Sequence, residues 1–300
     1  LRSVNMETMG KILRNINKDG LVRLIHFLAK RSFRFWEKYF SLHIVPAHFF
    51  SPIPVTYELD SGVFEKIYDC NGIDWNLAGQ LEYLHKLFPK YHLEYTPSTN
   101  TGLSLVDAFA LYAMIREKKP GIMIAIGAGN STKVSLQALQ MNKKEGNSYK
   151  FYSVEPYPGD EIKGIEDEDF ELIHRKIQDV EIDLLSTADL LFIDSTHVSK
   201  IDSDVNYEIL EIVPKLKVGS LVHWHDIVIP TNYWKEWIED GNQFFNESYM
   251  VHSFMLFNES FKTIWAARYM KLNYYSEMQQ VFPYLQSNHH LMSFWIERTK

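Results

Sequence analysis

The sequence of 300 residues has a single cysteine, Cys70, and no long apolar run. One thiol excludes an intrachain disulfide and a zinc site built from several cysteines, and it suits a reducing compartment. None of the apolar runs approaches the roughly 18 residues that a membrane-spanning helix needs, and the sequence shows no secretory signal pattern. We therefore expect a cytoplasmic protein.

An excess of positive charge is also missing. The formal net charge at pH 7 is −7, whereas a nucleic-acid-binding protein is usually basic, so we expect no nucleic-acid partner. Apolar residues make up 46% of the chain and aromatic residues 14%, which is typical of a globular protein whose large rings line a core or a ligand cleft. The length suits one large domain, or a domain with a sizeable appendage.

The most informative stretch begins with a short apolar run over 121–126, which predicts a buried strand. A turn that contains Gly127 and Gly129 follows this strand, and apolar residues at helical spacing follow the turn. A second apolar run over 151–154 predicts another strand, which ends on Glu155. Strand, glycine turn, helix, strand and acid form the plan of a nucleotide-binding βαβ unit.

The residues of this unit have separate physical roles. Gly127 and Gly129 tolerate a positive φ and have no Cβ, so that a ligand fits against the backbone. Ser131 or Thr132 is placed to cap the following helix, whose free N–H groups face the ligand. Glu155, at the carboxyl end of the second strand, is placed to accept hydrogen bonds from two ribose hydroxyls.

The N-terminal part of the chain predicts basic helices. Residues 21–36 mix apolar and cationic side chains, which suits either an amphipathic helix on an anionic membrane surface or a helix packed on the main domain. A proline-rich segment over 46–54 carries His48 and predicts either a structural strap or a lid over a substrate cleft. We expect a mainly helical N-terminal elaboration, a main domain and a helical tail, over 1–100, 101–270 and 271–300.

Strands and helices alternate through the rest of the chain. Helices are predicted over 77–87, 103–118, 205–213 and 232–238. Further strands are predicted over 171–179, 189–194 and 219–226, and a terminal antiparallel hairpin over 249–257 and 261–268. This alternation predicts an α/β fold with a parallel sheet that is covered on both faces.

Polar residues gather at the predicted strand ends. Ligands of such sheets bind outside the carboxyl ends of the strands. These ends carry Gly127, Glu155, Gln178 with Asp179, Asp194, and His225 with Asp226. Core packing does not explain why five successive strands bring polar groups to one edge, so we expect an active site there.

Seven short stretches resemble one family. They are His48-Phe-Phe-Ser-Pro-Ile-Pro, Gly72-Ile-Asp, Gly127-Ala-Gly-Asn-Ser-Thr, Val154-Glu-Pro-Tyr-Pro, Leu191-Phe-Ile-Asp-Ser-Thr-His-Val-Ser-Lys, Asp202-Ser-Asp-Val-Asn-Tyr and Val222-His-Trp-His-Asp-Ile-Val-Ile-Pro. With them the chain resembles a class I S-adenosylmethionine-dependent methyltransferase, in the family 24-like branch found with polysaccharide and glycan biosynthesis proteins. The resemblance implies a Rossmann-like fold with a mostly parallel seven-stranded sheet and an antiparallel terminal hairpin.

The same resemblance implies a binding site for S-adenosylmethionine. Glu155 would hold the ribose, Gln178 and Asp179 would lie beside the adenine, and Asp194 would lie between cofactor and acceptor. The methionine and ribose portion would contact the glycine turn, at Gly127, Ala128, Gly129, Asn130 and Ser131.

One position departs from the family pattern. The family's first strand usually carries an acid two residues before the first glycine of the turn, where it helps to hold the methionine ammonium, and here that position is Ala125. Asp107 or Asp194 would have to replace this acid. Without a replacement, the chain would be a non-catalytic relative that serves as a binding or scaffold protein.

Methyl transfer to a hydroxyl needs a general base or a metal, because the oxygen has to become nucleophilic. His197, His223 and His225 are candidates for the base, since imidazole titrates near neutral pH. We favour His225, which lies closest to the strand end, with Asp226, His197 and His48 nearby. The alternatives are a core position for His223 and a structural, helix-capping position for His197.

A metal site is the other expectation. Asp194, His225 and Asp226 resemble the site of metal-dependent O-methyltransferases; oxygen ligands suit Mg²⁺, whereas a histidine favours Mn²⁺ or a similar ion. Asp194 alternatively binds only the cofactor. We expect an O-methyltransferase that acts on a hydroxyl of a sugar, glycolipid or similar small molecule. Peripheral membrane contact through the N-terminal helix, a lipid-linked acceptor and a homo-oligomer stay open.

Overall fold

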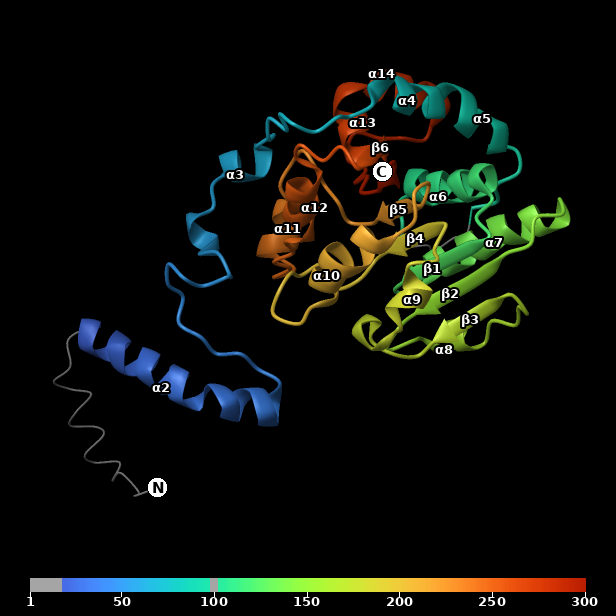
Figure 1. Cartoon of the computed structure of the whole chain (residues 1–300). Helices are drawn as coiled ribbons and strands as arrows, with labels where there is room; N and C mark the ends of the chain where they lie inside the picture. Colours follow the sequence, from blue (N-terminus) through green and yellow to red (C-terminus); the bar gives the residue numbers. More distant parts are fainter. Residues whose placement is uncertain (1–17, 98–101) are drawn as a thin grey trace. The chain divides into compact units, whose positions relative to one another are not determined.

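The computed structural model describes residues 18–97 and 102–300, and its contacts divide the chain into two units, 1–60 and 61–300 (Figure 1). The described elements of the first unit are helix α2 (Lys18–Phe40) and the 3₁₀ turn η1 (Thr56–Glu58). The contact division falls after Asp60, and Leu84, Leu87 and Phe88, which we predicted within an N-terminal elaboration over 1–100, contribute to a core of the larger unit. In the described part of the chain, no helix combines the length and the apolar content needed to cross a bilayer.

The described strands of the second unit form a seven-stranded sheet in the order β3-β2-β1-β4-β5-β7-β6. The strands are β1 (Ile122–Ile126), β2 (Lys150–Val154), β3 (Phe170–Ile173), β4 (Leu190–Ile193), β5 (Leu221–Trp224), β6 (Phe261–Ala266) and β7 (Phe294–Arg298). The first five are parallel to one another, and β7 is antiparallel to both β5 and β6. This topology confirms the predicted Rossmann-like sheet with an antiparallel edge.

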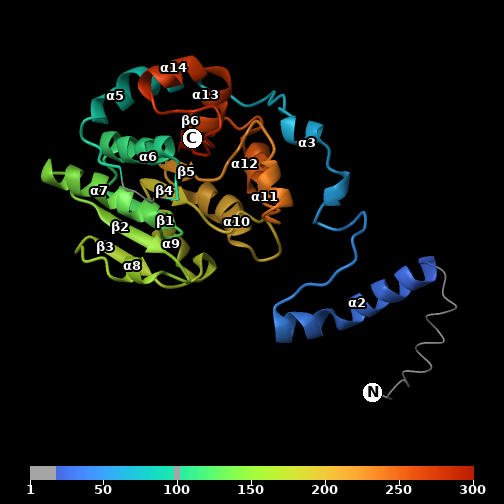
Figure 2. The ribbon, with the colours of Figure 1, turned by 180° about the vertical axis from the view of Figure 1, so that it is seen from behind.

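Helices cover both faces of the sheet (Figures 1 and 2). Along β1, Met123 and Ala125 face a core that includes α6, α7 and α14, while Ile124 and Ile126 face a core that includes α9, α10 and α12. The α-helices are α3 (Ser61–Glu65), α4 (Leu77–Glu82), α5 (Phe88–Tyr91), α6 (Leu105–Lys118), α7 (Asn130–Lys144), α8 (Asp160–Lys163), α9 (Ile182–Leu185), α10 (Asp204–Tyr207), α11 (Lys235–Glu239), α12 (Glu247–Met255), α13 (Ala267–Asn273) and α14 (Tyr275–Val281). Short helical turns are η2 (Tyr83–Leu87), η3 (Ile177–Asp179), η4 (Glu208–Ile212) and η5 (Val213–Lys215).

The predicted hairpin over 249–257 and 261–268 is wrong in its first strand. That segment lies mainly in helix α12, whose buried residues Glu247, Val251 and Met255 recur every four positions and so form one helical face. The partner of β6 is β7, which lies in the predicted helical tail over 271–300. The tail therefore contributes a strand to the main sheet after α13 and α14.

The third predicted strand, over 171–179, is also shorter than expected. Strand β3 ends at Ile173, and the chain then turns into η3, which contains Gln178 and Asp179. Two polar residues, His174 and Arg175, directly follow the last pairing, of Val154 with Ile173. The consequence is that Gln178 reaches the edge of the sheet from a 3₁₀ turn instead of from a strand end.

Candidate active site

Four neighbouring strands end in register at one edge of the sheet. Ile126 of β1 pairs with Val154 of β2 and with Ile193 of β4, and Ile193 pairs with Trp224 of β5. Because these pairs are the last of their ladders, the next residue of each strand stands in one row. The row consists of Gly127, Glu155, Asp194 and His225.

The turn after β1 requires glycine at its first position. Gly127 has a φ of +95°, and a Cβ built there would lie 2.2 Å from the backbone oxygen of Asp194. A Cβ at Gly129 would meet no atom within 4 Å, so this part of the backbone is open to the adjoining space. Helix α7 begins at Asn130, and the Gly129 N–H donates to the Thr132 hydroxyl at 3.2 Å. The turn therefore presents an uncovered helix start.

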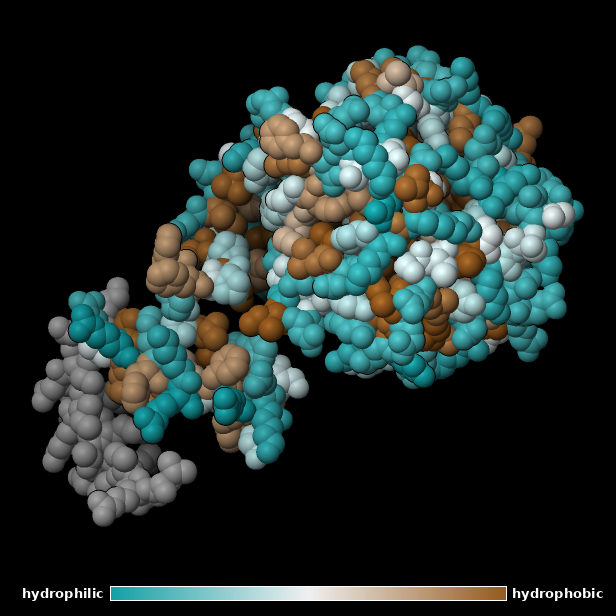
Figure 3. All heavy atoms as spheres, viewed as in Figure 1, coloured by the Kyte–Doolittle hydropathy of each residue, from teal (hydrophilic) through white to brown (hydrophobic). Residues whose placement is uncertain are grey.

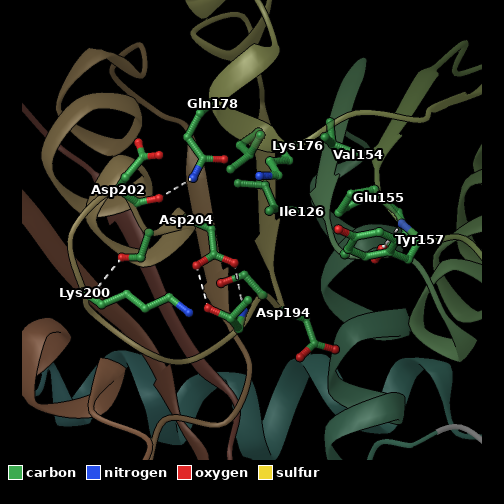
Figure 4. A pocket seen from close by; sticks show the side chains of 16 residues that line it. Ile126, Val154, Glu155, Tyr157, Lys176, Gln178, Asp194, Lys200, Asp202 and Asp204 are labelled. Atoms are coloured by element: carbon green, nitrogen blue, oxygen red, sulfur yellow. Dashed lines mark hydrogen bonds between the residues drawn. The ribbon is translucent and has the colours of Figure 1, made fainter. Parts of the chain in front are cut away.

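Two adjoining cavities lie at this edge, and they share Gly127, Glu155 and Asp194. The first, of about 410 Å³, is lined by residues of the β2, β3 and β4 ends, including Gln178 (Figure 4). The second, of about 530 Å³, is lined by the glycine turn from Gly127 to Ser131 and by the polar residues that follow β4 and β5. An extended ligand can therefore contact both cavities across the shared residues.

The first cavity presents polar groups against an apolar wall. One Glu155 carboxylate oxygen accepts from the Tyr157 N–H at 2.7 Å, and the other accepts from the Ala128 N–H at 3.4 Å. Gln178 lines the cavity and donates its side-chain amide to the Asp202 carbonyl at 2.9 Å (Figure 4). Asp179, the neighbour of Gln178, lines neither cavity.

Asp107, which the sequence suggested as a cofactor-binding residue, lines neither cavity. Its carboxylate is fully buried and accepts hydrogen bonds from the backbone N–H groups of Met292 and Ser293 and from the Ser104 hydroxyl. The sequence placed Asp107 beside the apolar stripe of its helix, and burial of that face directs it into the protein. It ties α6 to the segment before β7.

A compact cluster of carboxylates and imidazoles, which we name the acid–histidine cluster, borders the second cavity through all of its members except Glu247. It consists of Asp194 after β4, His197 in the next loop, His225 and Asp226 after β5, and Glu247 at the start of α12. The His197 Nε2 atom lies 3.1 Å from Asp226 and 3.4 Å from Asp194. The His197 Nδ1 atom lies 2.8 Å from Glu247, which is fully buried.

The other imidazole of the cluster belongs to His225. Its Nδ1 atom lies 3.1 Å from Asp226 and 3.7 Å from Asp194, while its Nε2 atom is buried without a hydrogen-bond partner among the described residues. His197 and Asp226 both have positive φ, at 59° and 57°. Strained backbone at such positions is typical of functional sites.

Mutual attraction controls the charges of the cluster. Burial opposes a charge on His197, but the three neighbouring carboxylates raise its pKa to about 12. Burial likewise opposes a charge on His225, and Asp226 with Asp194 raises its pKa to about 10. Burial opposes the charges of Asp194 and Asp226, but hydrogen bonds and charge attraction from the two imidazoles hold the pKa values of both carboxyls well below their usual range. Burial raises the pKa of Glu247.

The other two candidate histidines, His223 and His48, lie outside the cluster. His223 is fully buried, stacks on Trp295 with ring centres 4.2 Å apart and has no hydrogen-bond partner among the described residues. Burial lowers its pKa well below the usual value, so His223 is a neutral core residue. His48 lies exposed in the first unit, where its Nδ1 accepts from the Phe50 N–H. A role for His48 in the site stays a prediction.

The acid–histidine cluster has the composition of a cation site. Asp194, His197 and Asp226 each offer a ligand atom, and these atoms lie within 4.8 Å of one another. The set differs from the predicted one, because His197 takes the place of His225. Glu247 holds the second nitrogen of His197, as carboxylates behind metal-binding histidines do. Sequence patterns gave no signal for Glu247, since only the fold brings α12 to the strand ends.

Comparison with known proteins finds a family match over the centre of the chain. Residues 124–227, which contain the glycine turn, Glu155, Asp194 and Asp226, match the family model described as a methyltransferase domain. This match identifies a methyltransferase domain within the chain. The chain is 32% identical, over 163 residues, to an uncharacterized protein of Archaeoglobus fulgidus; the match covers 47% of this chain and 72% of the relative.

The methyltransferase is also similar to solved structures. One is the S-adenosylhomocysteine-bound Podospora anserina methyltransferase PaMTH1, with 12% identity, a TM-score of 0.44, and coverage of 73% of this chain and 88% of that chain. Another is the O-methyltransferase TomG from Streptomyces achromogenes in complex with S-adenosylmethionine, with 12% identity, a TM-score of 0.42, and coverage of 73% and 90%.

The two cavities of the methyltransferase fit the chemical parts of its cofactor. Open glycine backbone at the start of α7 suits the methionine portion, the Glu155 carboxylate suits a ribose diol, and Gln178 with the apolar wall suits the adenine. Ala125 is buried in the core and supplies no acid for the methionine ammonium. Because Asp107 is turned away, Asp194 is the one of the two suggested replacements that borders the cavities.

Proposed function

We propose that this methyltransferase transfers the methyl group of S-adenosylmethionine to a hydroxyl of a sugar or glycolipid, with a divalent metal assisting. The observation that carries the proposal is the acid–histidine cluster, which borders the same cavity as the glycine turn. In the reaction the acceptor O–H loses its proton to a base, the oxygen forms a bond to the methyl carbon, and the carbon–sulfur bond breaks. The electron pair of that bond stays on sulfur and gives S-adenosylhomocysteine.

The residues of the cluster support a division of labour. Asp194, Asp226 and His197 would hold the metal, and Glu247 would fix the orientation of the His197 ring. A metal held there would lower the pKa of a bound hydroxyl and would neutralise the carboxylates. Once a metal had taken over the charge of Asp194 and Asp226, these carboxylates would no longer hold His225 protonated, and its imidazole would be able to receive the acceptor proton. A mixed ligand set of oxygen and imidazole favours Mn²⁺ over Mg²⁺.

The walls of the second cavity support a sugar acceptor. Trp237 and Phe245 line it beside Gln243, and both aromatic rings are partly exposed. Aromatic faces combined with a few polar groups suit a ring that is apolar on its faces and carries hydroxyls on its edge. Replacing Trp237 with alanine should raise the KM for the acceptor more than it lowers kcat, because the ring contacts the substrate away from the reacting atoms.

Calorimetric titration with S-adenosylmethionine tests the cofactor part of the proposal. We expect the wild-type protein to bind, and Glu155→Ala to weaken binding by about tenfold to a hundredfold, since it removes hydrogen bonds to a charged group. Glu166→Ala is the matched control, because Glu166 is an exposed acid that lines neither cavity. Equal affinities of the two variants would contradict this assignment of Glu155.

Titration with Mn²⁺ tests the part of the proposal that concerns the metal and the base. His197→Ala should weaken Mn²⁺ binding, whereas His225→Ala should retain it and lower the rate of radiolabelled methyl transfer to a panel of sugars and lipid-linked sugars. The opposite pattern would exchange the roles of the two histidines. Binding of S-adenosylmethionine without methyl transfer to any hydroxyl, with or without metal, would refute the acceptor class and leave the cofactor site intact.

A further inference from the structure

The apolar face of α2 is a large exposed feature that methyl transfer does not use. Leu21, Ile25, Leu28, Phe35 and Tyr39 recur at helical spacing, and their exposed fractions lie between 37% and 63%. Among the side chains of α2 that the structure describes, none is buried. Figure 3 shows apolar and hydrophilic side chains together at the surface of this helix.

Cations occupy the opposite face of α2. Arg23, Lys30, Arg34 and Lys38 follow one another at intervals of seven, four and four residues, which aligns them along one side of the helix. The whole helix contains six Lys or Arg residues and two acids. Within the described residues, no carboxylate forms an ion pair with these four cations. The positive face is therefore free to attract an anionic surface.

Large aromatic side chains concentrate at the end of the helix and continue beyond it. Phe35, Trp36 and Phe40 contact one another with ring centres 5.3 to 5.8 Å apart. Phe49 and Phe50, in the segment that follows, are 95% and 85% exposed. Aromatic rings are favoured at the boundary between lipid headgroups and acyl chains, where both apolar and polar surroundings are available.

We propose that α2 binds the surface of an anionic lipid bilayer. The helix would lie parallel to the surface, with its apolar face at the acyl boundary and its cations against the lipid phosphates. At 1.5 Å per residue, the 23 residues of α2 form a rod of about 35 Å, enough for several such contacts. The inference rests on α2 and the aromatic residues that follow it, and it does not depend on the proposed methyl transfer.

Two other occupants of this face are less consistent with its chemistry. A second copy of α2 would bring the two rows of cations together, and the apolar face covers about half of the helix circumference, wider than a coiled-coil seam. The 61–300 unit contains the acidic excess of the chain and would attract the cations. Docking of α2 on that unit would not, however, explain the exposed aromatic residues that continue past the helix.

Co-sedimentation of the full chain with vesicles tests the proposal. We expect binding to vesicles of phosphatidylcholine mixed with phosphatidylserine, little binding to phosphatidylcholine alone, and release at high salt. Arg23→Glu with Arg34→Glu should weaken binding at least about tenfold, since each cation near such a surface contributes about 1 kcal/mol. The control, Lys144→Glu with Lys262→Glu, changes the net charge equally on exposed positions of the other unit and should bind like the wild type.

The contribution of the apolar face of α2 is tested with a separate variant. Ile25→Asn with Leu28→Asn should also reduce binding, and Trp36, the one tryptophan in residues 1–60, should show blue-shifted emission on vesicles that is absent in Trp36→Phe. Failure of the wild type to bind anionic vesicles would overturn the proposal. In that case, the molecular mass in solution of the Ile25→Asn, Leu28→Asn protein is compared with that of the wild type. A lower mass would identify a second copy as the occupant, and an equal mass would identify the 61–300 unit. Equal weakening by the Lys144 and Lys262 control would overturn it as well, since net charge alone would then explain binding.

Discussion

At the scale of single residues, His197 shows how a loop side chain is fixed in one orientation. Both of its ring nitrogens face carboxylates, Glu247 on one side and Asp226 with Asp194 on the other. Only Glu247 is fully buried, and it approaches from a helix instead of from the strand ends. Its contribution is therefore to position the ring, while the other two acids are available to a ligand.

Replacing Glu247 with glutamine tests this positioning role. Glutamine keeps the shape but removes the charged acceptor, so the ring of His197 loses its fixed tautomer, and we expect Mn²⁺ affinity to fall about tenfold to a hundredfold. Binding of S-adenosylmethionine should not change, because Glu247 lines neither cavity. Both affinities are measured by calorimetry, with Glu166→Gln as the control. Unchanged Mn²⁺ affinity in Glu247→Gln would show that Glu247 contributes only to packing and does not orient the His197 ring.

Gly127 and Gly129 allow a paired experiment on the turn. Gly127→Ala places a Cβ against the Asp194 backbone at a positive φ, so we expect a loss of at least about 2 kcal/mol in the free energy of unfolding. Gly129→Ala meets no protein atom and should leave stability nearly unchanged while weakening S-adenosylmethionine binding, because its Cβ enters the cavity. Urea unfolding and calorimetry measure the two effects. Similar stability losses in both variants would contradict the geometry of the turn.

At the scale of elements, Arg116 connects α6 by hydrogen bonds to α7 and to the segment after α5. Its guanidinium is almost fully buried and bonds to Glu94, Asn142 and Glu145. Hydrogen bonds from Arg116 lower the pKa of Glu94, and those from Arg116 and Lys119 lower the pKa of Glu145 to about 2. Helix α6, whose last turn contains Arg116, shares a core with Met123 and Ala125 of β1, the strand that leads into the glycine turn.

The stability of this contact should depend on pH. Because the folded pKa values lie below the ordinary value of 4.5, the stabilisation is complete above that pH and is lost as pH falls through the folded values. We expect Arg116→Leu to lower the free energy of unfolding by about 2 kcal/mol at neutral pH, and by less at about pH 3. Thermal unfolding at both pH values measures the difference, and exposed Arg175→Leu is the control. A difference in unfolding free energy between the wild type and Arg116→Leu that stays the same at both pH values would exclude Glu94 and Glu145 as its cause.

The elements also explain how far the sequence alone could predict the fold. The strand before Gly127 and those before Glu155, Asp194 and His225 were predictable, because each is a short apolar run that ends at a glycine or a polar residue. The segment over 249–257 is apolar at both strand and helix spacing, so its pattern could not decide between them. Asp107 and Glu247 were beyond sequence reasoning, since packing of α6 and α12 determines which way their carboxylates point.

At the scale of the whole molecule, cofactor binding should appear as stability. A ligand that binds only the folded protein adds about 2.7 kcal/mol at a concentration of one hundred times its Kd. For a unit of this size we expect S-adenosylhomocysteine to raise the Tm by about 5 °C, and Glu155→Ala to abolish most of the increase at the same concentration. Thermal scans of the full chain with and without ligand measure this. A wild-type Tm that stays constant at millimolar ligand would contradict the cofactor assignment.

The position of β7 between β5 and β6 links the active site to the order of synthesis. Strand β5, which delivers His225 and Asp226, pairs with β4 on one side and with Phe294–Arg298 on the other. A nascent chain still lacking these last residues would expose the backbone edge of β5, an edge prone to pairing with other chains. Chains cut short before Phe294 should therefore be prone to aggregation and lack a fixed acid–histidine cluster, because the strand that delivers His225 and Asp226 has lost one of its two neighbours.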